Sequence, residues 1–201
     1  MTAPPQELAY EQEFAAYMGG GYVDMVNSGT TAVFAAVGAL QLPAGSEVIV
    51  PPITDPGGAM PVALLNLVPV VADAAPGTFN AGAAEIEAVI TSRTSGIVIA
   101  HIAGEPCDMA AIMAVADKHN LPVIEDCAQA HGARFNGQLV GTFGAIAAVS
   151  TMSGKHHATG PQGGVVFSKD EVAICIKIDE FCIKNDGFCI KMVILIQTSR
   201  S

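Results

Sequence analysis

Lys155 lies in the stretch STMSGKHHATGPQGGVV, residues 150–166, among glycines and other small residues. A lysine that forms a Schiff base needs a mobile amine near the edge of a sheet, in surroundings that favour its neutral form part of the time. The small residues around Lys155 provide that mobility, so attachment of a carbonyl compound is one interpretation. A surface lysine is the other, and the loop alone leaves both open.

Metal binding is a second chemistry that this stretch raises, because His156 and His157 follow the lysine directly. Adjacent loop residues point their side chains apart, and the sequence spaces no third ligand to join them. The tail repeats Cys-Ile-Lys at Cys175, Cys182 and Cys189, and this spacing matches no common ligand pattern. We therefore predict no metal site, and we expect reduced thiols because five cysteines fit no disulfide framework.

The stretch VNSGTTAVFAA, residues 26–36, could bind an anion. Ser28 can cap the helix predicted to follow, Gly29 lets the backbone approach a ligand closely, and Thr30 adds a hydroxyl. The N–H groups of a helix's first turn and the positive end of its dipole suit a phosphate. An ordinary helix cap is the more common explanation of so short a motif.

The stretch PVIEDCAQAHGA, residues 122–133, ends a predicted strand with a carboxylate. Asp126 could keep a pyridine nitrogen protonated, which makes the ring an electron sink, and Gln129 could reach a ring substituent. A solvated strand-end aspartate explains the motif as simply. Together, however, the anion site, Asp126 and Lys155 make up the phosphate cradle, pyridinium partner and Schiff-base lysine that pyridoxal phosphate (PLP) requires.

An α/β fold must position these residues. Short β-branched runs alternate with longer Ala-rich stretches, which predicts a three-layer sandwich with a mostly parallel sheet and helices on both faces. Each expected strand is nearly continuous in apolar residues, so both faces of the sheet should be covered. Ligands of such sheets bind at the carboxyl ends of the strands, where the candidate residues fall. Strands are expected over 22–26, 47–51, 68–74, 96–102, 121–127, 145–151 and 163–168, and helices over 31–42, 60–67, 83–91 and 109–120.

Composition excludes several classes of partner. The 201 residues suffice for one large core and leave little room for two independent domains. The formal charge of -10 repels phosphate backbones and anionic bilayers, so we expect no nucleic-acid partner. No apolar run approaches the roughly 20 residues that span a bilayer, and the N-terminus lacks a signal-peptide pattern. We therefore expect a cytoplasmic protein with no membrane partner.

Five segments carry a family resemblance: NSGTTA, GSEVIVPPIT, IVIAHIAGEPCDMAAIMAVADKHNLPVIEDCAQAHGA, VGTFG and SGKHHATGPQGGVVFS. They resemble the DegT/DnrJ/StrS family of sugar aminotransferases, PLP enzymes of fold type I. The likeness runs from about Tyr22 to Ser168, and its most diagnostic parts are 125–132 and 155–164. It implies a PLP-binding large domain over residues 1–170, followed by an atypical repeat tail over 171–201.

The resemblance also implies roles for single residues. Lys155 would form the Schiff base with the cofactor and then move protons, and Asp126 would pair with the ring nitrogen. Gln129 would contact the 3-hydroxyl of the ring, and the phosphate would be bound by Gly29, Thr30 and Ser150. Family members in which histidine replaces the lysine are dehydratases, and the presence of Lys155 argues against that branch.

The chain departs from the family pattern in two ways. Where many members place an aromatic residue against the cofactor ring, this chain has Asp55. The resemblance implies that members continue into a smaller C-terminal domain. Because the likeness ends shortly after Ser168, we expect this chain to lack that domain. The tail over 171–201 repeats every seven residues, but the residues at its repeated positions would make a poor coiled-coil interface. We interpret the tail as a tandem duplication in the coding DNA or as the product of an out-of-frame end. A shortened chain should expose apolar surface and self-associate.

The sequence therefore predicts a PLP-dependent aminotransferase, homodimeric like its relatives. It would move an amino group from an amino acid such as glutamate to a keto-sugar, one that is nucleotide-linked, in polysaccharide or secondary-metabolite biosynthesis. Two alternatives stay open: a truncated protein that binds PLP or a partner without turnover, and a PLP-dependent sugar dehydratase. A Rossmann-like nucleotide-binding module ranks last, because no G-x-G-x-x-G follows the first predicted strand.

Overall fold

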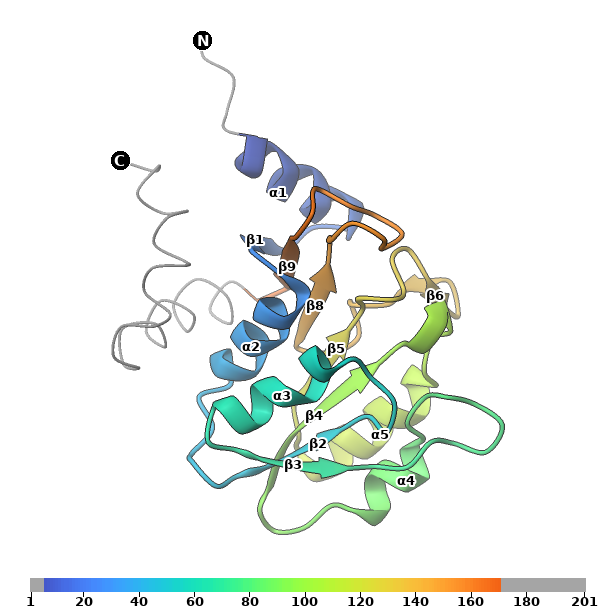
Figure 1. The fold of residues 1–201 in the computed structure, drawn as a ribbon. Helices are drawn as coiled ribbons and strands as arrows, with labels where there is room; N and C mark the ends of the chain where they lie inside the picture. The colour runs from blue at the N-terminus through green and yellow to red at the C-terminus, as the bar shows by residue number, and fades with distance from the viewer. Residues whose placement is uncertain (1–5, 171–201) are drawn as a thin grey trace.

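The computed structural model describes residues 6–170, and the repeat predicted as a separate tail lies outside them. Within these residues, helices pack on both faces of a seven-stranded sheet, as Figure 1 shows. The strand order is β1-β9-β8-β5-β4-β2-β3, and a separate hairpin pairs β6 with β7. The predicted α/β class with a mostly parallel sheet is confirmed.

Every strand of the large sheet except β9 runs in the same direction. The strands β2, β3, β4, β5 and β8 pair in parallel, whereas β9 is antiparallel to both β8 and β1. The carboxyl ends of β1, β5 and β8 therefore lie at one edge, which we call the carboxyl edge. The strands are β1 (Tyr22–Val26), β2 (Glu47–Val50), β3 (Val68–Val71), β4 (Thr94–Ala100), β5 (Val123–Asp126), β6 (Arg134–Phe135), β7 (Gln138–Leu139), β8 (Ile146–Ser150) and β9 (Gly164–Ser168).

The helices divide between the two faces of the sheet because alternate strand residues point to opposite sides. Val98 and Ile124 pack into the cluster under α2 and α3, whereas their neighbours Ile97 and Val123 pack against α5. Phe167 of β9 belongs to a third cluster, which lies under α1. The helices are α1 (Gln6–Tyr17), α2 (Gly29–Ala39), α3 (Pro56–Leu64), α4 (Ala83–Ala88) and α5 (Met109–His119), with a short 3-10 turn over Ile102–Gly104.

Three helix ends follow directly from local sequence. The Ser28 side chain accepts a hydrogen bond from the Thr31 N–H at 3.1 Å, which confirms the predicted cap of α2. Asp108 caps α5 in the same way, through the Ala111 N–H at 3.1 Å. The helix α5 ends where Asn120 adopts a left-handed conformation, a common helix stop. None of the helices described within residues 6–170 is long and apolar enough to cross a bilayer.

The fold differs from the sequence-based expectation in four places. The helix expected over 60–67 begins four residues earlier, at Pro56, and α1 and the β6–β7 hairpin were not predicted. The sheet is also not covered everywhere, because the edge strand β3 exposes its apolar residues: Val68 is 44% and Val71 is 59% exposed. That prediction was wrong for β3 since an apolar run does not distinguish a central strand from an edge strand.

Candidate active site

The start of α2 packs directly on the end of β8 at the carboxyl edge. A Cβ atom on Gly29 would lie only 2.6 Å from the Cβ of Ser150, so only glycine allows this approach. The first-turn N–H groups of a helix lack intrahelical partners, and Ser28 satisfies that of Thr31. The exposed hydroxyl of Thr30 lies at the same turn. Three of the predicted phosphate-binding residues, Gly29, Thr30 and Ser150, are therefore brought together.

Ser150 is held from the other side by a histidine that sequence reasoning did not single out. His131 Nε2 donates a hydrogen bond to the Ser150 carbonyl at 2.7 Å, so this nitrogen carries the proton. The remaining nitrogen, Nδ1, is buried without a hydrogen-bond partner among the described residues. Burial lowers the pKa of His131, and the nearby His156, His157 and Lys155 lower it further. The imidazole therefore favours its neutral form.

Asp126 is the last residue of β5, at the carboxyl edge as predicted. Its side chain is buried, and Oδ1 accepts a hydrogen bond from the Ala128 N–H at 3.0 Å. Burial raises the pKa of Asp126, while the Ala128 N–H and the charge of Lys155 act in the opposite direction. A buried carboxylate with this environment is stabilised by any cation placed beside it.

Lys155 lies in the loop that joins β8 to β9. The loop closes on itself through the Lys155 N–H, which donates to Met152 O at 3.2 Å, and the Thr159 N–H, which donates to Thr151 O at 2.9 Å. The Lys155 side chain is 17% exposed, and its Nζ lies 3.7 Å from Oδ2 of Asp55. Asp55, which the sequence resemblance sets where many members have an aromatic residue, thus forms an ion pair with the candidate Schiff-base lysine.

Asp55 lies at the N-terminus of α3, where sequence reasoning expected a turn. It occupies the N-cap position but does not cap the helix, so its carboxylate is available to Lys155. The next residues, Gly57 and Gly58, let α3 approach the site: a Cβ on Gly58 would lie 3.2 Å from Asp126 Oδ2, and one on Gly57 would collide with Thr30. The sequence Pro-Gly-Gly was the available signal, since proline favours the first turn of a helix.

Gln129 shares a pocket with Asp126, Asp55 and His101. Its Oε1 accepts a hydrogen bond from the Ala103 N–H at 2.9 Å. The structure therefore places all six predicted site residues at the carboxyl edge, in two adjoining groups. Gly29, Thr30 and Ser150 form one, and the second contains Asp126, Gln129 and Lys155.

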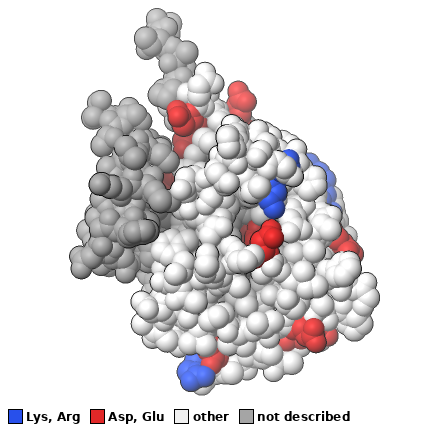
Figure 2. Space-filling view, in the orientation of Figure 1, with Lys and Arg blue, Asp and Glu red and all other residues white. Residues whose placement is uncertain are grey.

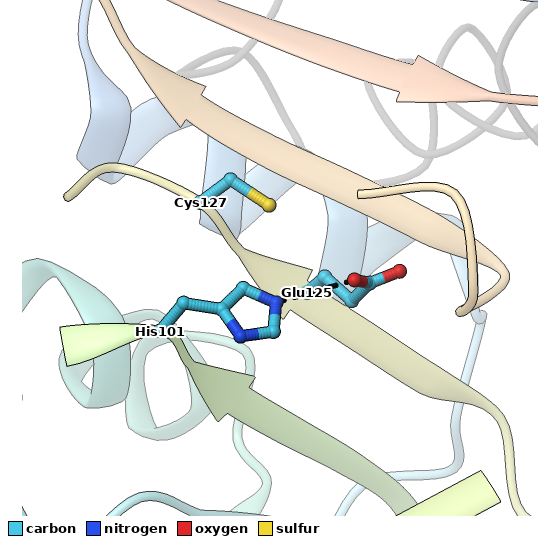
Figure 3. Close-up of side chains that lie close together, drawn as sticks. All are labelled: His101, Glu125 and Cys127. Carbon is cyan, nitrogen blue, oxygen red and sulfur yellow. Dashed lines mark hydrogen bonds and ion pairs between the residues drawn. The ribbon is translucent and has the colours of Figure 1, made fainter. Parts of the chain in front are cut away.

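A buried polar network lies beneath this edge, and Figure 3 shows two of its members, His101 and Glu125, with the Cys127 side chain close to them. The Glu125 carboxylate accepts backbone N–H groups of Gly141, Phe143 and Gly144 at 2.6–2.8 Å, and His101 Nε2 donates to it at 3.2 Å. His101 Nδ1 accepts the Cys107 N–H at 3.0 Å.

The side chains of His101, Glu125 and Cys127 approach one another closely enough to hold a metal ion. The Glu125 oxygens already accept four hydrogen bonds, and burial raises the pKa of the Cys127 thiol well above its usual value. We therefore interpret His101 and Glu125 as a hydrogen-bonded support for the carboxyl edge.

Comparison with known proteins places the chain in a family. Residues 1–190 match the DegT/DnrJ/EryC1/StrS aminotransferase family, and the chain belongs to it. It is 40% identical to GDP-perosamine synthase of Caulobacter vibrioides over 171 residues, which cover 85% of this chain and 46% of that enzyme. It is 42% identical to UDP-N-acetyl-3-dehydro-alpha-D-glucosamine 3-aminotransferase of Acidithiobacillus ferrooxidans, over 82% of this chain and 45% of that enzyme.

Solved structures give the same result. The aminotransferase from Psychrobacter cryohalolentis superposes with a TM-score of 0.84 at 41% identity, over 92% of this chain and 47% of that one. Two other matched structures contain PLP or its amino form: GDP-4-keto-6-deoxy-D-mannose-3-dehydratase of E. coli with hydrated PLP, at 28% identity, and a Bacillus subtilis protein with the amino form, at 29% identity. PLP is therefore the cofactor of the family, as the resemblance implied. The chain spans about half the length of the curated relatives that it matches.

The residues present fit this cofactor. The approach of Gly29 to Ser150 leaves a helix start and a hydroxyl side by side, which suits a phosphate. Asp126 is a buried carboxylate that a pyridinium charge would stabilise. Lys155 is a partly buried amine in the same group of residues.

Proposed function

We propose that this chain is the cofactor-binding part of a PLP-dependent aminotransferase that acts on sugars. The donor is an amino acid such as glutamate, and the acceptor is a keto-sugar carried on a nucleotide. The observation that carries the proposal is the meeting of Lys155, Asp126 and the Gly29–Ser150 contact at one edge of the sheet. The names of the relatives, which include GDP- and UDP-sugar enzymes, support the substrate class.

Each residue has a task that its surroundings suit. Bound PLP supplies an electron sink for the electron pair released when a proton leaves the carbon that carries the amino group. Asp126 holds the proton on the ring nitrogen, because a buried carboxylate favours an adjacent cation. Lys155 Nζ would take up the proton that leaves this carbon and later return a proton, and the loop of small residues lets the amine move.

The phosphate is held by a preorganised cradle. The first turn of α2 donates N–H groups at Gly29 and Thr30, and Ser150 adds its hydroxyl. His131 fixes the Ser150 backbone through the 2.7 Å hydrogen bond to its carbonyl. Because these groups are already in place, the loss of conformational entropy when the anion binds is small.

We extend the proposal to the setting in which the protein works. The PLP-binding domain comprises residues 1–170, and two copies of the protein form a homodimer in the cytoplasm. The absence of a membrane-spanning helix within residues 6–170 is compatible with this setting. Lys155 favours amino transfer over dehydration, because the dehydratase branch of the family carries histidine at this position.

The test is cofactor attachment to Lys155. Purified protein is mixed with PLP, reduced with borohydride and digested, and the modified peptide is identified by mass. We expect the visible absorbance of bound cofactor and a label on Lys155, both lost in Lys155→Ala. Lys118→Ala, which changes an exposed lysine on α5, serves as the control and should retain both.

A second measurement distinguishes an enzyme from a binding protein. Glutamate is added to the PLP-loaded protein, and conversion of the cofactor to its amino form is followed by absorbance. Conversion supports the transaminase. Attachment without conversion supports the non-catalytic PLP-binding alternative, and no attachment to Lys155 contradicts the proposal.

A further inference from the structure

We propose that Asn80 is a positioning residue for Gln129 and that it acts through the backbone turn at Ala103. The inference rests on the proposed function and on the role that the family resemblance implies for Gln129, which is contact with the 3-oxygen of the cofactor. Asn80 precedes α4 in sequence and lies outside every motif discussed above. Its connection to the site is a chain of hydrogen bonds that begins at its own buried amide.

Asn80 holds the two sides of one turn. Its side chain is 4% exposed, the Ile102 N–H donates to its Oδ1 at 2.9 Å, and its Nδ2 donates to the Glu105 carbonyl at 2.8 Å. The residue is itself fixed, because its N–H donates to the Thr78 hydroxyl at 3.2 Å. A buried amide with both ends satisfied is costly to replace, since removal leaves the Ile102 and Glu105 groups unpaired.

The turn that Asn80 holds contains an unfavourable backbone. Ala103 has φ 54 and ψ 23, the left-handed conformation that a residue with a Cβ adopts only at a cost in free energy. Such strain persists only where the surrounding structure imposes it. Here the Asn80 hydrogen bonds on both sides of Ala103 impose it, and the Glu105 N–H adds a bond to Ile102 O at 3.0 Å.

The strained turn directs one N–H group at Gln129. The Ala103 N–H donates to Gln129 Oε1 at 2.9 Å. A backbone N–H can only donate, so this contact assigns the oxygen end of the amide to Ala103. The NH2 end then remains as the donor of a side chain that lines the pocket with Asp126. A donor is what the anionic 3-oxygen of the cofactor requires.

The loop over residues 101–107, which contains this turn, is also fixed at both of its ends by the buried network. His101 precedes the turn, and its Nδ1 accepts the Cys107 N–H at 3.0 Å while its Nε2 donates to Glu125. In Figure 3 the imidazole of His101 lies beside the Glu125 side chain of the neighbouring strand. Asn80 and His101 therefore hold residues 101–107 at separate points, and the Ala103 N–H has little freedom to leave Gln129.

The first experiment compares PLP-loaded Asn80→Ala with Gln129→Ala and with the double variant. The readout is the ratio of the two absorbance bands of the lysine-bound cofactor, which reports hydrogen bonding at its 3-oxygen. We expect each single change to shift the ratio in the same direction by about two- to tenfold. The double variant should shift it no further than Gln129→Ala alone, because Asn80 acts through Gln129.

Two control variants separate positioning from general loosening. Ala103→Gly keeps the N–H and relieves the strain, so its ratio should equal that of the wild type. Thr78→Val disturbs the loop that carries Asn80 without touching Ala103, and its ratio should change less than that of Asn80→Ala. An additive double variant, or an unchanged ratio in Asn80→Ala, would overturn the inference.

A second experiment tests, in the absence of cofactor, whether Asn80 positions Gln129. Hydrogen exchange of the Ala103 amide is measured by NMR in the cofactor-free protein. Asn80→Ala and Gln129→Ala should each speed its exchange, whereas Thr78→Val should have a smaller effect. Unchanged exchange in Asn80→Ala contradicts the inference. If the wild type binds no PLP, the proposed function fails while this measurement still decides whether Asn80 positions Gln129.

Discussion

The contact between Gly29 and Ser150 joins two segments that are far apart in the chain. Replacing Gly29 by alanine places a Cβ 2.6 Å from that of Ser150, so α2 must move away from β8. We expect Gly29→Ala to weaken PLP binding by about tenfold or more, equivalent to about 1.4 kcal/mol. The measurement is a PLP titration followed by absorbance.

The loop that carries Lys155 offers a matched control for this substitution. A Cβ on Gly160 would meet its nearest atom, the Gln162 carbonyl oxygen, at 3.7 Å, which is ordinary contact. Gly160→Ala should therefore bind PLP as the wild type does. Equal affinity in Gly29→Ala would show that the cradle does not depend on the close approach.

Asp126 should make the stability of the cofactor-free protein depend on pH. Burial raises its pKa in the folded state, so its contribution is most favourable below the pKa of the unfolded chain. That contribution is lost as the pH rises through the folded-state pKa, and above that pKa the folded protein bears the full cost of the buried charge. Asp126→Asn removes this cost while keeping an oxygen for the Ala128 N–H.

We therefore expect Asp126→Asn to raise the melting temperature at pH 8 by about 2–4 °C and to flatten its pH dependence. The same variant should bind PLP more weakly, because the ring nitrogen loses its charged partner. Asp117→Asn, an exposed position on α5, serves as the control and should change neither property. A lower melting temperature in Asp126→Asn would mean that the carboxylate stabilises the empty fold.

At the residue scale, the sequence predicted groups whose role depends on near neighbours. The Ser28 cap and the place of Asp126 at a strand end follow from adjacent residues. The ion pair of Lys155 with Asp55 and the hold of Asn80 on the Ala103 turn depend on loops that meet only after folding. No local pattern encodes such contacts, since loop positions are set by packing.

At the scale of elements, α1 is attached to the rest of the fold by a lysine. Lys169 Nζ donates to the carbonyls of Met18, Gly19 and Gly20 at 3.0–3.1 Å, where α1 ends. A cation at a helix C-terminus also favours the helix dipole. The helix α1 also contacts the loop that carries Lys155. Tyr10 and His157 share a hydrogen bond at 3.0 Å, and their rings stack with centroids 5.6 Å apart.

Lys169→Met should release α1 locally while leaving the sheet folded. We expect faster hydrogen exchange of the α1 amides, by about fivefold or more for a loss near 1 kcal/mol, and unchanged exchange in α5. Lys118→Met removes an exposed ion pair of α5 with Glu87 and should leave α1 unaffected. Uniform change across the protein after Lys169→Met would argue against a local attachment.

The elements that the sequence predicted are those with a clear apolar pattern. The central strands and α5 were found because their apolar runs coincide with burial. The helix α1 was missed because polar residues are mixed through QELAYEQEFAAY and it packs mainly through Tyr10 and Phe14. The β6–β7 hairpin had a usable signal in Asn136-Gly137, whose positive φ values suit a tight turn.

At the scale of the whole molecule, charge is sparse and apolar side chains reach the surface. On the face drawn in Figure 2, blue and red groups are few and scattered, and uncharged surface dominates. Two neighbouring elements expose apolar side chains, Met60 and Leu64 on α3 and Val68 and Val71 on β3. We call these four residues the α3–β3 patch. Exposed apolar surface was expected from the sequence.

The α3–β3 patch includes an edge strand, which can pair with a strand of another copy. β3 hydrogen-bonds only to β2 within the described sheet, so its other side offers free backbone groups. The net charge of -10 opposes association, because copies repel one another. Self-association through β3 therefore requires apolar and backbone contacts that outweigh this repulsion, and screening by salt should promote it.

Val71→Lys tests this surface, since a lysine on an edge strand disfavours pairing with another edge. We expect light scattering to show larger species for the wild type than for Val71→Lys at equal concentration, with the difference growing as salt is added. Adding one lysine also lowers the repulsion between copies, so Ala114→Lys, an exposed position on α5, is the matched control. That control should associate at least as much as the wild type. A monodisperse, monomeric wild type at high salt would contradict association through the α3–β3 patch, because repulsion could then no longer explain its absence.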